Sequence, residues 1–314
     1  MVSIPSAQSP GEGEPVMLVH TAEPHQSPDR IVILGVAGFV GGAVAARLSA
    51  GHVPVLPLGR QEIDLLDADA AVRLAALLRP TDALLITAAR APCRTPAMMV
   101  ENIRMMGTVC RALEDVKPAH LVYVSSDAVY ADLSDPLTEQ SPAAPGSLHG
   151  AMHLAREQML KAAHDGPLAI VRPSLLYGLA DPHDGYGPNR FRRLALAGED
   201  IVLFGEGEEL RDHVLIGDAA ELIRGVLHRR SHGVLNIASG HIVSFREIAE
   251  RTVALLGSKS TVTASPRLQP MPHNGYRPFD DTARRRAFPD FLPTLPVEGL
   301  ARTCREALAR AGRS

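Results

Sequence analysis

The stretch RIVILGVAGFVGGAVAARL, residues 30–48, decides the fold. It begins with a short apolar run, RIVILG, which predicts a buried strand. Gly35, Gly38 and Gly41 follow at three-residue spacing, and a helix is expected from about Gly38 to Ala50. Glycines in such a turn let the backbone approach a pyrophosphate, whose negative charge is stabilised at a helix N-terminus. The pattern predicts a dinucleotide site, although a tight turn that packs the helix on the strand without a ligand would look the same.

The same alternation of strand and helix continues along the chain. Four further strands are predicted at HVPVLPL (52–58), DALLITAA (82–89), AHLVYVSS (119–126) and PLAIVRPS (167–174). Helices are predicted at Ala70–Leu78, at Ala97–Glu114 and in SLHGAMHLAREQML (147–160). Nearly continuous apolar strands between helices are typical of a parallel sheet covered on both faces. We therefore predict an α/β, doubly wound (Rossmann) fold, with ligands at the carboxyl ends of the strands.

After Gly178 the elements become shorter and more loop-like, which predicts a smaller, mostly C-terminal domain that holds the substrate. The expected organisation is a disordered extension over 1–29, a dinucleotide-binding domain over 30–177 with returning segments at about 212–238, and a substrate domain over 178–211 and 239–314. Within the returning segments, the chain is expected to rejoin the sheet near Val214–Ile216 and Val234–Ala238.

The composition argues against several classes of protein. The chain has 314 residues, a formal net charge of −3 and 46% hydrophobic residues, which gives no electrostatic reason for a nucleic-acid or anionic-membrane partner. No membrane span is expected, because the most apolar run, 31–46, is short and contains four glycines. Residues 1–29 lack a basic start and an apolar stretch, so no signal peptide is expected. Three cysteines without metal-ligand spacing fit reduced thiols in a cytoplasmic protein without a metal site.

Several motifs together resemble the extended short-chain dehydrogenases/reductases, the branch of nucleotide-sugar epimerases, dehydratases and ketoreductases. They are the glycine loop, ITAA at 86–89, VSSDAVY at 124–130 and VRPSLLYG at 171–178. LFGEGEELRDHVLIGDAAELI, at 203–223, is similar to the substrate-domain signature of the same branch. The resemblance covers residues 30–256.

The resemblance implies a nicotinamide dinucleotide as cofactor. NAD-binding members usually carry an acid at the end of the second strand, but VLPLGR at 55–60 has none and ends in Arg60, which could pair with a 2′-phosphate. NADP(H) is therefore favoured, with NAD(H) as the alternative, since an exposed Arg60 without a ligand fits nearly as well. Asp64 matches the family's adenine-contacting aspartate, although it could equally cap a helix. The expected cofactor contacts are Gly35, Gly38, Phe39, Val40, Gly41, Arg60, Asp64, Leu65, Ala88, Ala89, His153 and Pro173.

In the family that the chain resembles, a Ser or Thr holds the substrate oxygen, and a Tyr-x-x-x-Lys pair handles the proton. Ser126 matches the first position, while His149 and His153 fall on the tyrosine and lysine positions, a register that Glu157 supports. Because imidazole titrates near about 6.5, His149 could donate a proton without a lysine. One imidazolium shared by the two histidines, which lie on one helix face, could protonate an alkoxide.

Three other interpretations of this region stay open. The histidines could be ordinary side chains of a protein that binds cofactor without turnover. Together with Glu157, one helical turn further on, they could hold zinc. Alternatively, Tyr130 or Tyr177 could supply the proton, although packing alone also explains both aromatic residues.

The same resemblance implies where the substrate binds. Asn189 and Arg211 match positions that hold the diphosphate of a nucleotide sugar, and a pyrophosphate favours guanidinium and amide donors. Asp127 and Arg190 complete the predicted substrate contacts, although in so Arg-rich a chain a solvated surface role is the alternative for any one arginine. Asn102 resembles the active-site asparagine of the wider family, or is a polar residue within the helix packing.

The expected function is therefore that of an NADPH-dependent ketoreductase acting on a nucleotide-activated keto-(deoxy)sugar. Reduction is favoured because it needs only a hydride, a polarising donor and a proton, whereas oxidation needs a base that acts before hydride leaves. A nucleotide-sugar epimerase or dehydratase is one alternative, and a non-catalytic NAD(P)-binding protein is another. A homodimer through the helices around 97–114 and 148–163 is expected from the resemblance alone.

Overall fold

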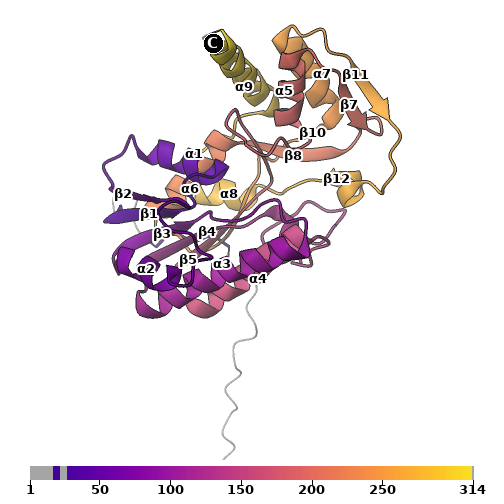
Figure 1. The fold of residues 1–314 in the computed structure, drawn as a ribbon. Helices are drawn as coiled ribbons and strands as arrows, with labels where there is room; N and C mark the ends of the chain where they lie inside the picture. The colour runs from indigo at the N-terminus through magenta and orange to yellow at the C-terminus, as the bar shows by residue number, and fades with distance from the viewer. Residues whose placement is uncertain (1–16, 22–26, 313–314) are drawn as a thin grey trace, which may run out of the picture.

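The computed structural model describes residues 17–21 and 27–312. A six-stranded sheet lies at the centre of the larger lobe, with strand order β2-β1-β3-β4-β5-β9 and every neighbouring pair parallel (Figure 1). Its strands are β1 (Arg30–Leu34), β2 (Val55–Leu58), β3 (Asp82–Ile86), β4 (His120–Val124), β5 (Leu168–Pro173) and β9 (Gly233–Ile237). The strand order reverses between β1 and β3, and ligands bind beyond the carboxyl ends of strands at such switch points.

Helices cover both faces of this sheet because the strand side chains alternate between the two faces. Ile31 and Ile33 join the core beneath α1 and α6, whereas Val32 and Leu34 join the core beneath α2, α3 and α4. The predicted doubly wound α/β fold is therefore confirmed. The bounds are α1 (Phe39–Leu48), α2 (Ala70–Leu77), α3 (Pro96–Asp115), α4 (Leu148–Ala163) and α6 (Ile216–His228), with the 3-10 helix η1 (Asp127–Val129) after β4.

A smaller lobe lies above one end of this sheet in Figure 1 and holds a second sheet. In it β8 has β10 and β12 as neighbours and also pairs with β6, while β7 and β11 form a separate pair. Phe191, Ile201, Phe245 and Leu300 belong to its core. The bounds are β6 (Leu175–Tyr177), α5 (Pro188–Ala197), β7 (Ile201–Phe204), β8 (Leu210–Leu215), β10 (Ile242–Ser244), α7 (Phe245–Leu256), β11 (Val262–Ser265), η2 (Pro272–Gly275), β12 (Tyr276–Arg277) and α9 (Pro296–Ala311). The short helix α8 (Thr282–Ala287) returns to the larger lobe, where Ala287 joins the core beneath α1 and α6.

One predicted return to the central sheet is wrong. The segment near Val214–Ile216 ends β8, which pairs with β10, β6 and β12 and with no central strand. A short apolar run before a helix looks like a strand of a βα unit, but its partners are set by distant segments that local pattern does not reveal. The second return does lie in the central sheet, because β9 pairs in parallel with β5.

The expected disordered extension over 1–29 is wrong for Met17–Thr21, which lies along the outer edge of β9. Leu18 donates its N–H to the carbonyl of Val234 at 3.1 Å, and Val19 and His232 exchange two hydrogen bonds of 2.9 Å. These bonds order the segment because they satisfy backbone groups that an edge strand would otherwise leave unpaired. Residues 27–29 are described as well, and Ser27 Oγ lies 2.9 Å from His228 Nδ1. The rest of the prediction, over 1–16 and 22–26, lies outside the described residues.

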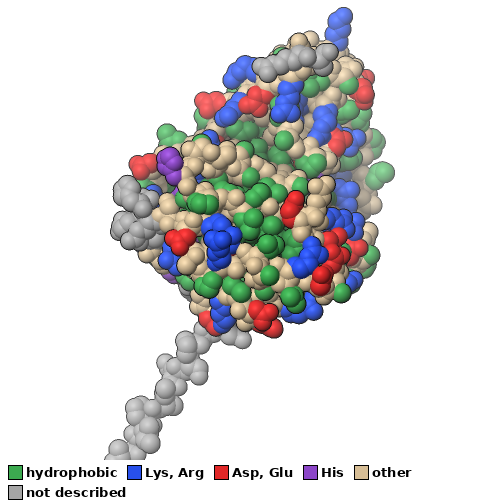
Figure 2. Space-filling view, turned by 60° about the vertical axis from the view of Figure 1, so that its left-hand side comes forward, with side chains coloured by type: hydrophobic (Ala, Val, Ile, Leu, Met, Phe, Trp, Pro, Cys, Tyr) green, Lys and Arg blue, Asp and Glu red, His purple; other side chains and the backbone are tan. Residues whose placement is uncertain are grey.

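The surface formed by the described residues carries side chains of both charges together with apolar ones. On the face shown in Figure 2, basic and acidic side chains are interspersed among apolar and uncharged groups. This matches the small formal net charge of −3. Within residues 17–21 and 27–312, no helix is both long and apolar enough to cross a bilayer.

Candidate active site

Two adjoining cavities involve the carboxyl ends of the central strands. The larger, of about 790 Å³, is lined by residues from both lobes, and the smaller, of about 230 Å³, lies beside the glycine loop. Gly38, Thr87 and Ala89 line both cavities, so the two spaces meet at the N-terminus of α1. This is the place that the strand order predicts for a ligand.

The residues predicted to contact the cofactor all line one cavity or the other. The smaller cavity is lined by Gly35, Arg60, Asp64, Leu65 and Ala88, and both cavities by Gly38 and Ala89. The larger cavity is lined by Phe39, Val40, Gly41, His153 and Pro173. Residues far apart in the sequence are thus brought to one continuous surface.

The glycine loop forms a cradle that larger residues would fill. A Cβ atom at Gly41 would lie 2.3 Å from the carbonyl oxygen of Gly35. One at Gly35, where φ is +101°, would lie 2.5 Å from the backbone nitrogen of Ala88. Gly38 caps α1 without a side-chain hydrogen bond, and the first-turn amides, including those of Phe39 and Val40, have no acceptor within the helix. The loop therefore fits a pyrophosphate held by backbone amides.

The adenosine end of the predicted site contains a surface ion pair. The Nε of Arg60 donates to Asp64 Oδ2 at 2.8 Å, and the Arg60 side chain is 74% exposed. Hydrogen bonds from the Leu66 backbone and from Arg60 hold the pKa of Asp64 below its usual value. Glu62 accepts the N–H of Gly59 at 2.7 Å, so an acid does lie four residues after the end of β2, beyond the segment in which the sequence predicts none. Arg60 is accessible to a ligand, but it already has a carboxylate partner.

Three predicted catalytic side chains line the larger cavity together: Ser126, His149 and His153. The two imidazole rings pack edge to face, with their centroids 4.7 Å apart. His149 Nδ1 accepts the N–H of Cys93 at 3.3 Å, so a neutral His149 carries its proton on Nε2. Ser126 caps η1, where its Oγ accepts the N–H of Ala128 at 3.2 Å. The Ser126 hydroxyl donates to Asp127 Oδ1 at 3.4 Å, so one wall of the cavity carries a weakly bonded hydroxyl beside an imidazole.

Gly150 sets how closely α4 approaches η1. A Cβ atom at this position would lie 1.9 Å from the carbonyl oxygen of Ala128. The first turn of α4 therefore rests directly on the backbone that follows Ser126. This contact fixes the spacing between Ser126 and His149.

Burial lowers the pKa of both histidines. For His149, desolvation lowers the pKa, and the nearby Asp127 carboxylate raises it by a smaller amount. For His153, desolvation lowers the pKa well below its usual value, and His149 and Arg156 lower it further. The imidazolium that the sequence argument shared between the pair is thus disfavoured at neutral pH. A neutral imidazole can still polarise a carbonyl through its N–H.

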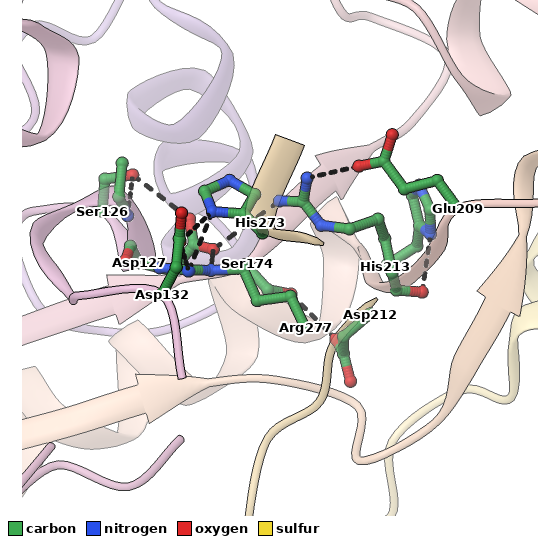
Figure 3. A network of polar contacts seen from close by, with 11 residues as sticks. Ser126, Asp127, Asp132, Ser174, Glu209, Asp212, His213, His273 and Arg277 are labelled. Atoms are coloured by element: carbon green, nitrogen blue, oxygen red, sulfur yellow. Dashed lines mark hydrogen bonds and ion pairs between the residues drawn. The ribbon is translucent and has the colours of Figure 1, made fainter. Parts of the chain in front are cut away.

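A polar network borders another side of the larger cavity (Figure 3). Arg277, only 2% exposed, donates from Nε to Asp127 Oδ2 at 3.1 Å and from Nη1 to Asp132 Oδ1 at 2.8 Å. The same Asp132 oxygen lies 2.5 Å from His273 Nδ1. The Asp127 carboxylate, predicted to contact substrate, therefore already binds a buried guanidinium.

The other predicted substrate residues divide into two groups. Arg211 and Asn189 line the larger cavity, where Arg211 pairs with Glu209 at 3.0 Å and Asn189 donates to Asp181 at 2.8 Å. Arg190 is exposed and lines neither of the two cavities, because consecutive positions of α5 face different directions. The expectation that Arg190 contacts substrate therefore has no support in the geometry.

The zinc interpretation of the helix also lacks support. Glu157 accepts Arg172 Nη2 at 2.6 Å and Ser125 Oγ at 2.5 Å, deep beneath the cavity wall. Its carboxylate is therefore engaged by a buried cation. In the part of the chain that the structure describes, no group of three or more His, Cys, Asp or Glu side chains is arranged to hold a metal ion.

Three further residues weighed from the sequence have other environments. Asn102 is fully buried and bonds the Arg90 backbone in both directions, at 2.9 and 3.0 Å, so it fixes the loop after β3. Tyr130 lines the larger cavity, but its hydroxyl donates to Asn236 at 2.6 Å. Tyr177 lines neither the larger nor the smaller cavity.

Four further residues at the larger cavity or its polar border are not among those predicted from the sequence: His213, His273, Asp132 and Arg277. His213 stands inside the recognised substrate-domain motif and could have been singled out there; it lines the larger cavity and lies edge to face against Phe245. His273 and Arg277 belong to a Pro-rich segment without periodic pattern, and only folding brings them to Asp132.

The model of the NAD dependent epimerase/dehydratase family matches residues 31–238, a span that contains the glycine loop and all three predicted catalytic residues. The chain belongs to this family. It is 25% identical over 302 residues to UDP-N-acetyl-alpha-D-glucosaminuronate decarboxylase of Bacillus cytotoxicus, covering 82% of this chain and 88% of the relative. It is 26% identical over 267 residues to dTDP-6-deoxy-L-talose 4-dehydrogenase (NAD(P)(+)) of Kitasatospora kifunensis, covering 77% and 84%. The family fold extends to the UDP-glucose 4-epimerase of Thermus thermophilus, solved in complex with NAD, with a TM-score of 0.78 and 22% identity over 88% of this chain and 98% of that one.

Proposed function

We propose that this member of the family is an NADPH-dependent reductase of a keto group on a nucleotide-activated (deoxy)sugar. The observation that carries the proposal is the meeting of Ser126 and His149 with the glycine loop in one cavity, which also contains Arg211 and Asn189. The relative from Kitasatospora kifunensis, whose name describes a dTDP-sugar 4-dehydrogenase using NAD(P)(+), supports the same class of chemistry.

The cofactor would occupy both cavities. Its pyrophosphate fits the cradle at Gly35, Gly38 and Gly41, and its adenosine fits the smaller cavity beside Asp64. The preference for NADPH rests on Arg60, whose guanidinium can add a second, phosphate partner to its present bond with Asp64. A bound nicotinamide would supply the hydride, and residues of the chain would stabilise the carbonyl oxygen and supply the proton.

Ser126 and His149 would act on the carbonyl oxygen of the substrate. The Ser126 hydroxyl donates to Asp127 Oδ1 at 3.4 Å in this structure, and by rotating it can donate to the substrate oxygen instead while its Oγ keeps the hydrogen bond from Ala128. His149 would present Nε2–H, since its Nδ1 accepts the N–H of Cys93. As negative charge develops on the oxygen, both donors stabilise it. When the Nε2 proton passes to the alkoxide, the imidazolate left behind would keep the Cys93 N–H bond at Nδ1 and regain a proton at Nε2 from solvent.

Reduction suits this pair better than oxidation. Burial lowers the pKa of His149, so its neutral ring can polarise an oxygen. Its only basic nitrogen, Nδ1, faces the Cys93 amide and would have to break that bond to take up a proton. A nucleotide-sugar epimerase or dehydratase must oxidise the sugar first, so it needs a base in position before hydride leaves.

The test is a turnover assay with a panel of nucleotide-linked keto-sugars, which follows loss of the reduced nicotinamide absorbance. We expect consumption of NADPH, and a loss of kcat on the order of 100-fold or more for His149→Phe. His52→Phe, which changes an exposed histidine outside both cavities, is the matched control and should leave turnover unchanged.

Each alternative gives a different result. Sugar conversion without net consumption of NADPH would identify an epimerase or a dehydratase. Cofactor binding without turnover of any keto-sugar would identify a non-catalytic protein. Full activity in His149→Phe would show that another group delivers the proton.

A further inference from the structure

His153 has a partner that the sequence pattern does not reveal. The hydroxyl of Tyr123, on β4, lies 2.7 Å from His153 Nδ1. Tyr123 is 1% exposed and His153 is 5% exposed, so water does not compete strongly for this bond. His153 nevertheless lines the larger cavity beside Gly38, Phe39 and Val40.

The direction of this hydrogen bond follows from which groups carry protons. Burial raises the pKa of Tyr123, so its phenol stays protonated and has one proton to donate. Among the described residues, His153 Nδ1 is the one hydrogen-bond partner recorded for that hydroxyl. The hydroxyl therefore donates and Nδ1 accepts, because a buried phenol proton without an acceptor is costly.

Because Nδ1 of His153 accepts a hydrogen bond, the position of the ring proton is fixed as well. A neutral imidazole whose Nδ1 accepts must carry its proton on Nε2. Nε2 of His153 has no hydrogen-bond partner among the described residues, and it is not among their fully buried unpartnered atoms. It is therefore the nitrogen that the cavity can reach.

Burial disfavours a charge on this ring, and the neighbouring cation adds to that effect. The guanidinium of Arg156 lies 5.2 Å from the centre of the Tyr123 ring, and its Nη2 donates to the carbonyl of Ala88 at 2.6 Å. His149 packs edge to face on the cavity side. A second positive charge on His153 would be buried next to Arg156, while Glu157, the nearest acid on the helix, is already bound to Arg172.

We propose that Tyr123 is a positioning residue that holds His153 as the neutral Nε2–H tautomer, so that His153 offers an uncharged N–H donor to the cofactor-side wall of the cavity. The assignment rests on the proposed cofactor site, where the acceptor would be a ribose hydroxyl of the nicotinamide nucleotide. The helix position that the family resemblance gives to a lysine is thus filled by a donor without a charge.

The proposal can be tested without substrate, by long-range ¹H–¹⁵N spectra of protein labelled at histidine. At pH 7 we expect His153, assigned by comparison with His153→Asn, to show a proton-free Nδ1 and a protonated Nε2. In Tyr123→Phe the donor is removed, and we expect the two tautomers to become mixed. Tyr177→Phe deletes another buried phenol, which lies outside both cavities, and should leave the His153 signals unchanged.

Cofactor affinity provides the second readout. Tyr123→Phe should weaken NADPH binding by about 2-fold for an even mixture of tautomers, because only His153 with its proton on Nε2 can donate, whereas Tyr177→Phe should not. A wild-type His153 that is Nδ1-protonated or cationic at pH 7 would overturn the proposal, even if Tyr123→Phe does not fold. An unchanged tautomer in a folded Tyr123→Phe would also overturn it. If the tautomer is as expected but no keto-sugar is reduced, the proposed function fails and the positioning role stands.

Discussion

Gly150→Ala isolates the contact between α4 and η1, on which the spacing of Ser126 and His149 depends. The new methyl group would lie 1.9 Å from the oxygen and 2.6 Å from the carbon of the Ala128 carbonyl. Since non-bonded heavy atoms prefer roughly 3.5 Å or more, the helix or the loop must move by more than about 1 Å. Neither partner at this contact is a flexible side chain, so backbone has to shift.

Two effects on stability oppose each other in this variant. Overpacking of this kind costs about 1–3 kcal/mol, while replacing a helical glycine by alanine returns up to about 1 kcal/mol. The net loss should therefore be about 0–3 kcal/mol, and the protein should still fold. Turnover should suffer more, because a misplacement of roughly 1 Å between reacting groups can cost on the order of 100-fold.

Gly217→Ala is the matched control, because Gly217 also lies in the first turn of a helix and a Cβ there meets nothing within 4 Å. Thermal unfolding and kcat for NADPH-dependent reduction should be measured on both variants and the wild type. We expect Gly150→Ala to unfold cooperatively at a lower temperature with strongly reduced kcat, and Gly217→Ala to keep near-normal values of both. Equal kcat in the two variants would refute the argument that this contact sets the catalytic spacing.

Three other perturbations test separate parts of the molecule. Arg60→Ala should weaken NADPH binding by roughly 3- to 10-fold, since Arg60 is an exposed cation that can pair with the 2′-phosphate. NADH lacks this phosphate, so its binding should be unchanged. An unchanged ratio of the two dissociation constants would remove the argument for NADPH. Glu157→Gln should lower the free energy of unfolding, measured in urea, by about 3–5 kcal/mol, because Arg172 would be left buried and without a charged partner. The control Glu306→Gln removes a carboxylate from an exposed pair and should cost under about 1 kcal/mol. Burial lowers the pKa of His120 from 6.5 to about 4, so between these pH values the unfolded chain binds the proton and the folded chain does not. Stability should therefore fall as pH drops from 6.5 towards 4, by on the order of 3 kcal/mol from this residue, and His120→Gln should flatten the curve.

The central sheet and the glycine loop could be predicted because their signals are local. Each strand is a short apolar run bounded by turns, and the glycine spacing at Gly35, Gly38 and Gly41 lies within a single strand–turn–helix unit. The i, i+4 spacing of Arg60 and Asp64 is a local signal of the same kind, and the two side chains do form an ion pair.

The remainder depends on contacts between distant segments. Nothing near His153 in the sequence indicates that Tyr123, 30 residues earlier, supplies its hydrogen bond. The partners of β8 and the approach of His273 to Asp132 across 141 residues are equally invisible to local pattern. The sequence also gives the wrong charge state for His149 and His153. Their pKa values are lowered by burial, and burial is a property of the folded chain. The homodimer through α3 and α4 stays a prediction.

The Met17–Thr21 segment has a consequence for how this protein can be handled. A shortened chain starting at Ser27 would lose the hydrogen bonds to Val234 and His232, leaving the rim of the parallel sheet open. Two such molecules could then pair through β9 of each, because an uncovered edge strand can form backbone hydrogen bonds with another chain. Removing the residues before Ser27 to aid crystallisation would therefore favour self-association. A truncation that begins at Met17 would keep the edge of β9 covered.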